Sequence, residues 1–162
     1  MKRSRRTRSV RVFNGHPRLR IPRDSVARLV RTLDDVASSH GWNPPDGELS
    51  VAFLTGAALA RIHGDFMGDP SPTDVITFPG DATAGTMGEI CVSADKAADI
   101  AAKRGLEFSR ELALYIVHGW LHLSGCDDKK SSARREMRAA ERAALAAAKS
   151  AGTIPAFTMT AR

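Results

Sequence analysis

Two histidines four residues apart, His118 and His122, are the arrangement in this sequence that most directly indicates chemistry. In a helix, that spacing places both imidazoles on one face, roughly 6 Å apart along the axis. Two ring nitrogens so placed can bind a single metal ion at about 2.0–2.1 Å each. The spacing alone is weak evidence, so the surrounding residues must decide whether it marks a metal site.

The residues around the pair favour a catalytic metal site. Gly119 leaves space beside the rings, Gly125 ends the helix, and Cys126-Asp127-Asp128 follows, so the chain can turn back and bring a carboxylate to the imidazoles. Two histidines and one carboxylate leave a fourth tetrahedral position for water, as in catalytic zinc sites. The alternative is a buried helix whose histidines bond to backbone carbonyls, followed by an exposed Asp-Asp turn.

The same histidine spacing occurs in the HExxH motif of zinc metalloproteases, where a glutamate after the first histidine acts as general base. Gly119 occupies that position here, so peptide hydrolysis by that route lacks its base. The sequence also contains no GxxxxGK phosphate-binding loop and no GxSxG nucleophile elbow. A zinc metalloprotease is therefore the less favoured hydrolase.

The apolar pattern predicts the elements that would position the histidines. Ser93 and Ser109 are expected to cap the helices that follow them, and the segment after Gly152 is expected to be frayed. Because helices and strands alternate along the chain, they indicate one α/β layer structure around a small sheet. Helices are expected over 22–41, 56–62, 94–103, 110–123 and 131–149, and strands over 10–13, 49–54, 75–78 and 87–92.

Length and composition fit one compact domain, since the 162 residues are 43% hydrophobic and 26% charged. No apolar run approaches the length that spans a membrane, and no apolar stretch after Met1 indicates secretion. The two cysteines, Cys91 and Cys126, form no CxxC pair. We therefore expect a cytoplasmic protein with reduced thiols.

The net charge of +6 combines two basic ends with an acidic middle. Residues 1–31 hold 11 basic residues and 1 acid, residues 32–128 hold 5 and 15, and residues 129–162 hold 8 and 2. Basic ends suit a nucleic-acid backbone, where lysine and arginine displace condensed counterions. A solubilising tail is an equal alternative for residues 1–9.

Three segments resemble signatures of the YbeY family of bacterial endoribonucleases, the rRNA maturation factors. Residues 118–128, HGWLHLSGCDD, are similar to that family's HGxLHLxGxDH. Residues 72–79, PTDVITFP, are similar to PTDVLSFP, and residues 87–93, MGEICVS, to LGDIxIS with Glu89 in place of Asp. The segments follow in the family's order, and the resemblance extends over about residues 10–145.

The resemblance implies a single-domain α/β (α+β) fold with a small mixed four-stranded sheet covered by about five helices. It implies one Zn²⁺ per chain and a single-strand-specific endoribonuclease that processes the 3′ end of 16S rRNA and acts in ribosome quality control. The implied partners are rRNA and the small ribosomal subunit, with no membrane and no nucleotide cofactor. The expected organisation is a basic tail over 1–9, the YbeY-like metal-dependent endoribonuclease domain over 10–150 and a C-terminal tail over 151–162.

The metal site that the resemblance implies consists of His118, His122 and Asp128, which would act in catalysis through the bound metal. The family has a histidine in place of Asp128, and a carboxylate can bind at a similar distance. The carboxylate reduces the net charge of a Zn²⁺ centre by one unit, so bound water is expected to be less acidic. Asp127 is expected to close the loop or support a ligand, and Cys126 is the alternative ligand.

A second departure from the family lies before Pro72, where the family carries an arginine thought important for activity. Counting back along the motif places Met67 there, and a thioether cannot neutralise a phosphate. Either another cation replaces it, with Arg61 and Lys129 as candidates, or the nuclease activity is weak or lost. His63, in the same segment, is either a hydrogen-bond donor to substrate or an ordinary loop histidine.

Basic side chains of the last helix are expected to hold the RNA backbone. Asp74 is expected either to take part in catalysis or to cap its strand and orient a ligand histidine. The competing interpretation is a non-catalytic ribosome-assembly factor in which the metal only fixes the histidine helix to the following loop. The candidates that would line the cleft or support a metal ligand are Asp74, Thr77, Asp127 and Glu89, and the RNA-binding candidates are Arg134, Arg135 and Arg138.

Overall fold

A computed structural model of the protein describes residues 7–69, 71 and 73–161. Its main sheet has the strand order β1-β3-β5-β4. β1, β3 and β5 are parallel, whereas β4 runs antiparallel to β5, so the predicted mixed four-stranded sheet is confirmed. The strands are β1 (Val10–Asn14), β3 (Glu48–Leu54), β4 (Val75–Pro79) and β5 (Thr86–Ser93), and each predicted strand range falls within one of them.

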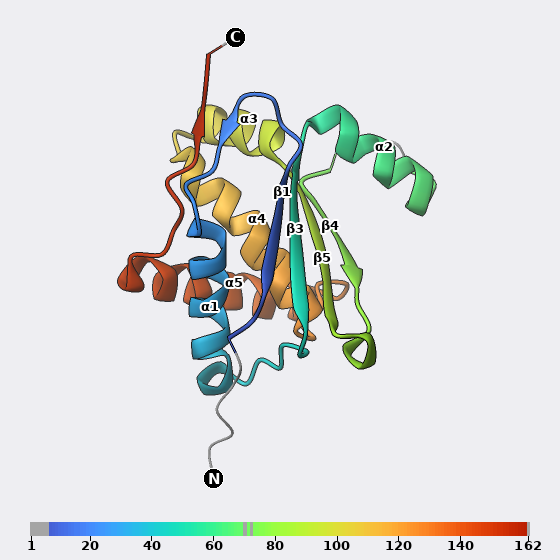
Figure 1. Ribbon diagram of the computed structural model, residues 1–162, viewed down its shortest axis with the longest axis vertical. Coiled ribbons are helices and arrows are strands. Elements are labelled where there is room, and N and C mark those ends of the chain that lie inside the picture. Colours follow the sequence, from blue (N-terminus) through green and yellow to red (C-terminus); the bar gives the residue numbers. More distant parts are fainter. Residues whose placement is uncertain (1–6, 70, 72, 162) are drawn as a thin grey trace.

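Five α-helices among the described residues cover the sheet unequally (Figure 1). Side chains alternate between the faces of a strand, and Ile90 and Val92 of β5 join the larger core, whereas Cys91 joins a smaller core with Leu59. The helix α2 (Gly56–Met67) covers that smaller core. The other face carries α1 (Ser25–Ala37), α3 (Ala94–Arg104), α4 (Phe108–Leu123) and α5 (Ser131–Ala151).

Several helix limits follow the predicted signals. The Ser93 hydroxyl accepts the Lys96 N–H at 3.0 Å, which confirms the predicted cap of α3. Ser109, in contrast, does not cap α4, because the helix already begins at Phe108, and the Ser109 hydroxyl donates to the Phe157 carbonyl at 3.1 Å. The prediction for Ser109 is wrong because a tertiary contact uses its hydroxyl.

The segment after Gly152 is not frayed, contrary to the prediction. Phe157 is 4% exposed, and its ring lies 5.5 Å from that of Phe53 in the core. The following strand, β6 (Thr158–Met159), pairs antiparallel with β2 (Leu19–Arg20). Burial of this aromatic ring, worth roughly 1.5–3 kcal/mol, and the pairing of β6 with β2 hold the segment against the body of the protein.

Arg8 is part of the folded body although it lies in the predicted basic tail, of which residues 1–6 fall outside the described residues. Its guanidinium contacts both carboxylate oxygens of Asp34, at 2.8 and 3.2 Å, and donates to the carbonyls of Pro45 and Gly47 at 2.8 and 2.7 Å. The Arg8 side chain is 8% exposed. Its charge is therefore used inside the protein and does not face a partner.

No helix in the described part of the chain is long and apolar enough to cross a membrane.

Gly119 lets α4 approach the sheet closely. A Cβ atom built at this position would lie 2.6 Å from Cγ2 of Ile90 and 3.1 Å from Cγ2 of Thr77. The space that the sequence indicates beside the histidines is thus filled by the sheet, and any side chain at position 119 would push α4 outward.

We expect Gly119→Ala to lower the free energy of unfolding by about 1–3 kcal/mol, because overpacking against Ile90 outweighs the better helix propensity of alanine. Chemical denaturation measures the change. Gly56→Ala is the matched control, since a Cβ there would meet its neighbours at an ordinary 3.7 Å. A Gly119→Ala protein as stable as the unmodified chain would contradict the close approach.

Candidate metal centre

The two histidines of α4 face each other at the end of the helix next to β4. Their Nε2 atoms lie 3.0 Å apart, and their ring centroids 4.5 Å apart. The Asp128 Oδ2 atom lies 3.4 Å from Nε2 of His122 and 3.7 Å from Nε2 of His118. Among the described residues, these three form the group that could hold a metal ion.

The distances fit a bound metal better than they fit three independent side chains. Two ligands that bind a tetrahedral zinc at 2.0–2.1 Å are about 3.3 Å from each other, and the three measured separations, 3.0, 3.4 and 3.7 Å, bracket that value. Each side chain is partly exposed, at 23, 27 and 39% for His118, His122 and Asp128. The donor set of two imidazoles and a carboxylate is one that zinc accepts, with a position left for water.

Hydrogen bonds from a side chain and from the backbone reverse the direction of the chain after α4. The Ser124 hydroxyl donates to the Trp120 carbonyl at 2.7 Å, and Gly125 takes a φ of 98°, which favours glycine. The Cys126 N–H then donates to the Leu121 carbonyl at 3.0 Å. This reversal carries Asp128 back to the rings, as the sequence predicts.

Two neighbours of Asp128 have other roles. The Asp127 carboxylate accepts the Lys129 N–H at 2.9 Å, which lowers the pKa of Asp127 and closes the loop, one of its two expected roles. Cys126 is half-buried and lies outside the group of possible ligands, and burial, with the charge of Glu136, raises the pKa of its thiol. A thiol with a raised pKa is a poor metal ligand at neutral pH.

Glu141 of α5 completes the centre, and the sequence analysis did not identify it. Its Oε1 atom lies 2.6 Å from Nδ1 of His118. An ionised carboxylate only accepts hydrogen bonds, so Nδ1 carries the proton and Nε2 keeps its lone pair for a metal. The available signal was its position on the apolar stripe of α5, four residues after the buried Met137 and four before the buried Leu145.

We expect Glu141→Gln to weaken zinc binding by about tenfold and Glu141→Ala by up to about a hundredfold, because the orientation and basicity of His118 are lost. Competition with a chelating dye measures the affinity. Glu136→Gln, an exposed position on the same helix, is the matched control and should leave the affinity unchanged. Equal affinities for all of these proteins would show that Glu141 does not support the ligand.

The charges around His118 also act on its protonation. Burial disfavours the charged ring, but the hydrogen bond that His118 donates to Glu141 and the charges of Glu141, Asp74 and Asp128 outweigh it. The pKa of His118 is therefore raised in the protein without a metal. The local field is negative and attracts a cation.

A hollow of about 150 Å³ opens beside the two rings, at the β4 edge of the sheet. Thr77 lines it, as predicted for a cleft residue, and so do His63 and Met67 from α2. His63 Nδ1 lies 3.1 Å from the carbonyl of Ser71, so its Nε2 atom is left for other contacts. Met67 thus faces the site.

The remaining acidic candidates differ in their placement. Asp74 accepts the N–H of Val75 at 2.9 Å and so caps the start of β4, while its charge contributes to the field at His118. Glu89 is not part of the site: it precedes Ile90, which packs under α4, so the alternation of β5 turns Glu89 to the opposite face beside Cys91. The prediction of Glu89 in the cleft is wrong for this reason.

The basic candidates lie outside the hollow. Arg134, Arg135 and Arg138 are exposed on α5, the helix that carries Glu141. Arg61 and Lys129 are also exposed, and neither is among the described residues that line the hollow.

A family model and several known proteins match most of the chain. The family model described as Endoribonuclease YbeY matches residues 12–149. An Endoribonuclease YbeY from Geobacter sulfurreducens is 32% identical over 135 residues, which cover 78% of this chain and 89% of that protein. One from Mycolicibacterium smegmatis is 37% identical over 133 residues, which cover 75% of this chain and 71% of that protein.

The fold also matches a solved structure, the solution structure of TM1509 from Thermotoga maritima, with a TM-score of 0.61 and 22% identity. The match covers 88% of this chain and 90% of that chain. With a family model that spans both the β-sheet and the histidine helix, the chain belongs to the YbeY family of endoribonucleases.

Proposed function

We propose that this protein is a zinc-dependent endoribonuclease that cleaves single-stranded regions of small-subunit rRNA precursors in the cytoplasm, at the 3′ end of 16S rRNA and in ribosome quality control. The observation that carries the proposal is the convergence of Nε2 of His118, Nε2 of His122 and a carboxylate oxygen of Asp128 beside an open hollow. The family match supports cleavage of RNA as the reaction.

The side chains of the site have three roles: they bind the metal, orient a ligand histidine and contact the substrate. A zinc ion, when bound, supplies a Lewis acid for a phosphate oxygen and lowers the pKa of a coordinated water. His118, His122 and Asp128 hold it, and Glu141 fixes the proton of His118 on Nδ1. No nucleophilic side chain is needed. Thr77 and His63 border the hollow and provide hydrogen-bonding groups for a phosphodiester placed there.

The protein recognises the phosphate backbone of RNA more than its bases. The arginines of α5 are exposed on the same helix as Glu141 and suit a phosphate backbone. With one tyrosine, two tryptophans and six phenylalanines, the chain has few rings for stacking bases. The ribosomal context, which presents one strand to the site, would then select the cleavage position.

Asp128 and Met67 both lower the rate at which this chain is expected to cleave RNA. Asp128 makes the centre less positive than three neutral histidines would, and Met67 gives the hollow no cation. We expect Met67→Arg to raise the rate of RNA cleavage about tenfold, and Asp128→His to raise it further if zinc stays bound. Gel assays on a small-subunit precursor measure both, with Phe66→Arg, an exposed neighbour on α2, as the matched control.

The direct test incubates the purified protein with a small-subunit rRNA precursor, with and without a chelator. Zinc-dependent cleavage that the chelator abolishes and added zinc restores supports the proposal. Binding of the precursor particle with no cleavage under either condition would overturn it and favour an assembly factor in which the metal only fixes α4 to the loop at Asp128.

A further inference from the structure

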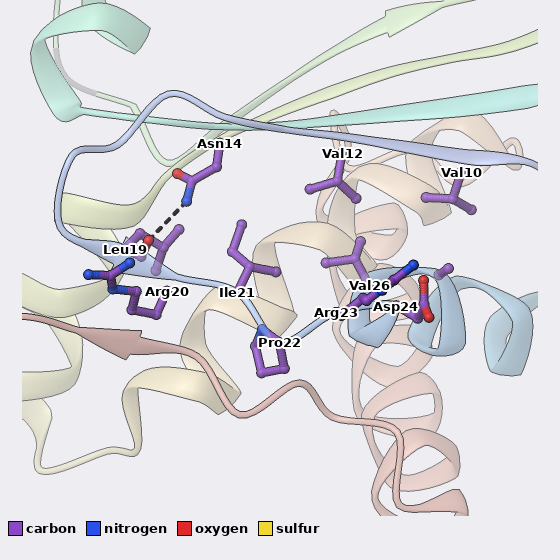
Figure 2. A pocket seen from close by; sticks show the side chains of 11 residues that line it. Val10, Val12, Asn14, Leu19, Arg20, Ile21, Pro22, Arg23, Asp24 and Val26 are labelled. Carbon is purple, nitrogen blue, oxygen red and sulfur yellow. Dashed lines mark hydrogen bonds between the residues drawn. The ribbon is translucent and has the colours of Figure 1, made fainter.

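A second hollow lies along β1, at the edge of the main sheet opposite the metal centre (Figure 2). This hollow, the β1 groove, has a volume of about 470 Å³. Figure 2 shows Val10, Val12 and Asn14 of β1 pointing into it from one side. Ile21 and Pro22 face them from the segment between β2 and α1, so the floor of the groove is apolar.

The backbone of β1 is unpaired along this groove. β1 is an edge strand, and among the described strands it pairs only with β3. The Ser9 carbonyl and the Gly15 N–H bond toward β3, at 3.0 and 2.8 Å. Backbone groups of a strand alternate in direction, so the N–H and C=O groups of Val10, Val12 and Asn14 point away from β3. These outward groups can accept an added strand.

The rim of the groove is basic. Arg20 and Arg23 line it and are exposed. Asp24 is the one acid of the lining. The two arginines outnumber this acid, so the field at the rim is positive.

Asp24 also marks the groove as strained. It takes a φ of 59° and is the one residue other than glycine with a positive φ in the described structure. Such a conformation is uncommon for residues other than glycine and is found disproportionately often at binding sites.

We propose that the β1 groove binds an extended acidic segment of a partner protein, which adds as a fifth strand to the edge of β1. Main-chain hydrogen bonds to the outward groups of β1 would provide affinity, as in other cases of strand addition. Alternate apolar side chains would fill the floor at Val12 and Ile21, and acidic side chains at the rim would meet Arg20 and Arg23. Five residues of strand span roughly 16 Å, the length of β1.

Two other occupants fit the observations less well. A second copy of the chain paired through β1 would bring two sets of arginines together at the same edge, and like charges oppose such pairing. RNA would use the arginines but not the unpaired amides or the apolar floor. The outward backbone groups of β1, the apolar floor and the basic rim together favour a peptide as the occupant of the groove.

The test uses a fluorescein-labelled peptide of four Val-Glu repeats with blocked ends, titrated with the full chain and followed by anisotropy. A peptide of four Val-Lys repeats and a Val-Glu peptide with N-methyl groups on alternate amides are the controls. Hydrogen exchange by NMR reports on the amides of Val10, Val12 and Asn14. We expect saturable binding of the Val-Glu peptide, protection of those amides, and at least tenfold weaker binding of both control peptides.

The decisive variant is Val12→Pro, which removes an outward N–H and leaves every bond to β3 in place. It should weaken peptide binding at least tenfold, whereas Val12→Thr, which keeps the amide, should not. Arg20→Glu with Arg23→Glu should also weaken binding tenfold, and Arg28→Glu, exposed on α1 outside the groove, should not. Zinc binding and thermal unfolding of each variant verify that it is folded.

Three results would overturn the proposal. They are no saturable binding of the Val-Glu peptide, equal binding by the Val12→Pro and Val12→Thr proteins, and protection of the β1 amides by a single-stranded RNA or by self-association of the chain without peptide. The last two occupants are distinguished by adding RNA alone and by sedimentation of the chain alone.

Discussion

Replacing His118 with alanine is expected to lower cleavage of a small-subunit rRNA precursor by about a thousandfold or more, which corresponds to about 4 kcal/mol of transition-state stabilisation. The replacement removes one of three converging ligand atoms and also leaves Glu141 without its hydrogen-bond partner. Single-turnover assays with excess protein separate this loss from weaker RNA binding, which should change by less than threefold.

The matched control for His118→Ala is His40→Ala. His40 is exposed, its ring stacks on Trp42 at 4.4 Å, and it lies outside the ligand group. Its removal should leave cleavage within twofold of the unmodified protein. If His118→Ala cleaved RNA as fast as His40→Ala, the residues of α4 would not take part in the reaction.

Replacing Asp34 with alanine is expected to lower the free energy of unfolding by about 3–5 kcal/mol, the cost of removing one partner of a buried ion pair. The change leaves the buried guanidinium of Arg8 without its counter-charge, and it removes the acceptor of the Trp120 indole N–H at 3.2 Å. Calorimetry should record a decrease in Tm of roughly 6–20 °C for a protein of this size.

The paired control replaces both partners with apolar residues of similar volume, Arg8→Met with Asp34→Leu. Because no charge is then left buried, this double variant should recover most of the stability that Asp34→Ala loses. A loss below 1 kcal/mol for Asp34→Ala would show that the pair contributes no more than a surface ion pair.

The sequence was sufficient for the parts of the fold that depend on local patterns. A continuous apolar run of strand length located β3, and Ser93 located the start of α3. The histidine pair and the return of the chain after Gly125 were predictable for the same reason, since helical spacing and a glycine with positive φ are local properties.

The rest depends on contacts between distant segments, which local patterns do not contain. Glu141 meets His118 only because α5 packs beside α4, and Glu89 leaves the site only because the register of β5 turns it away. From the sequence, Arg8 belongs to a charged tail. In the structure, Asp34 and two backbone carbonyls surround its guanidinium. In each case the tertiary partner of the residue could not be predicted, because it comes from a distant segment of the chain.

The metal content of the purified chain and of two single variants tests the central claim most directly. Elemental analysis after dialysis against buffer with trace zinc should find one zinc per chain, and the same for Cys126→Ala. Asp128→Ala should retain well below half of it, because the carboxylate that closes the group is gone. Full zinc retention by Asp128→Ala together with loss in Cys126→Ala would contradict the ligand set and the mechanism built on it.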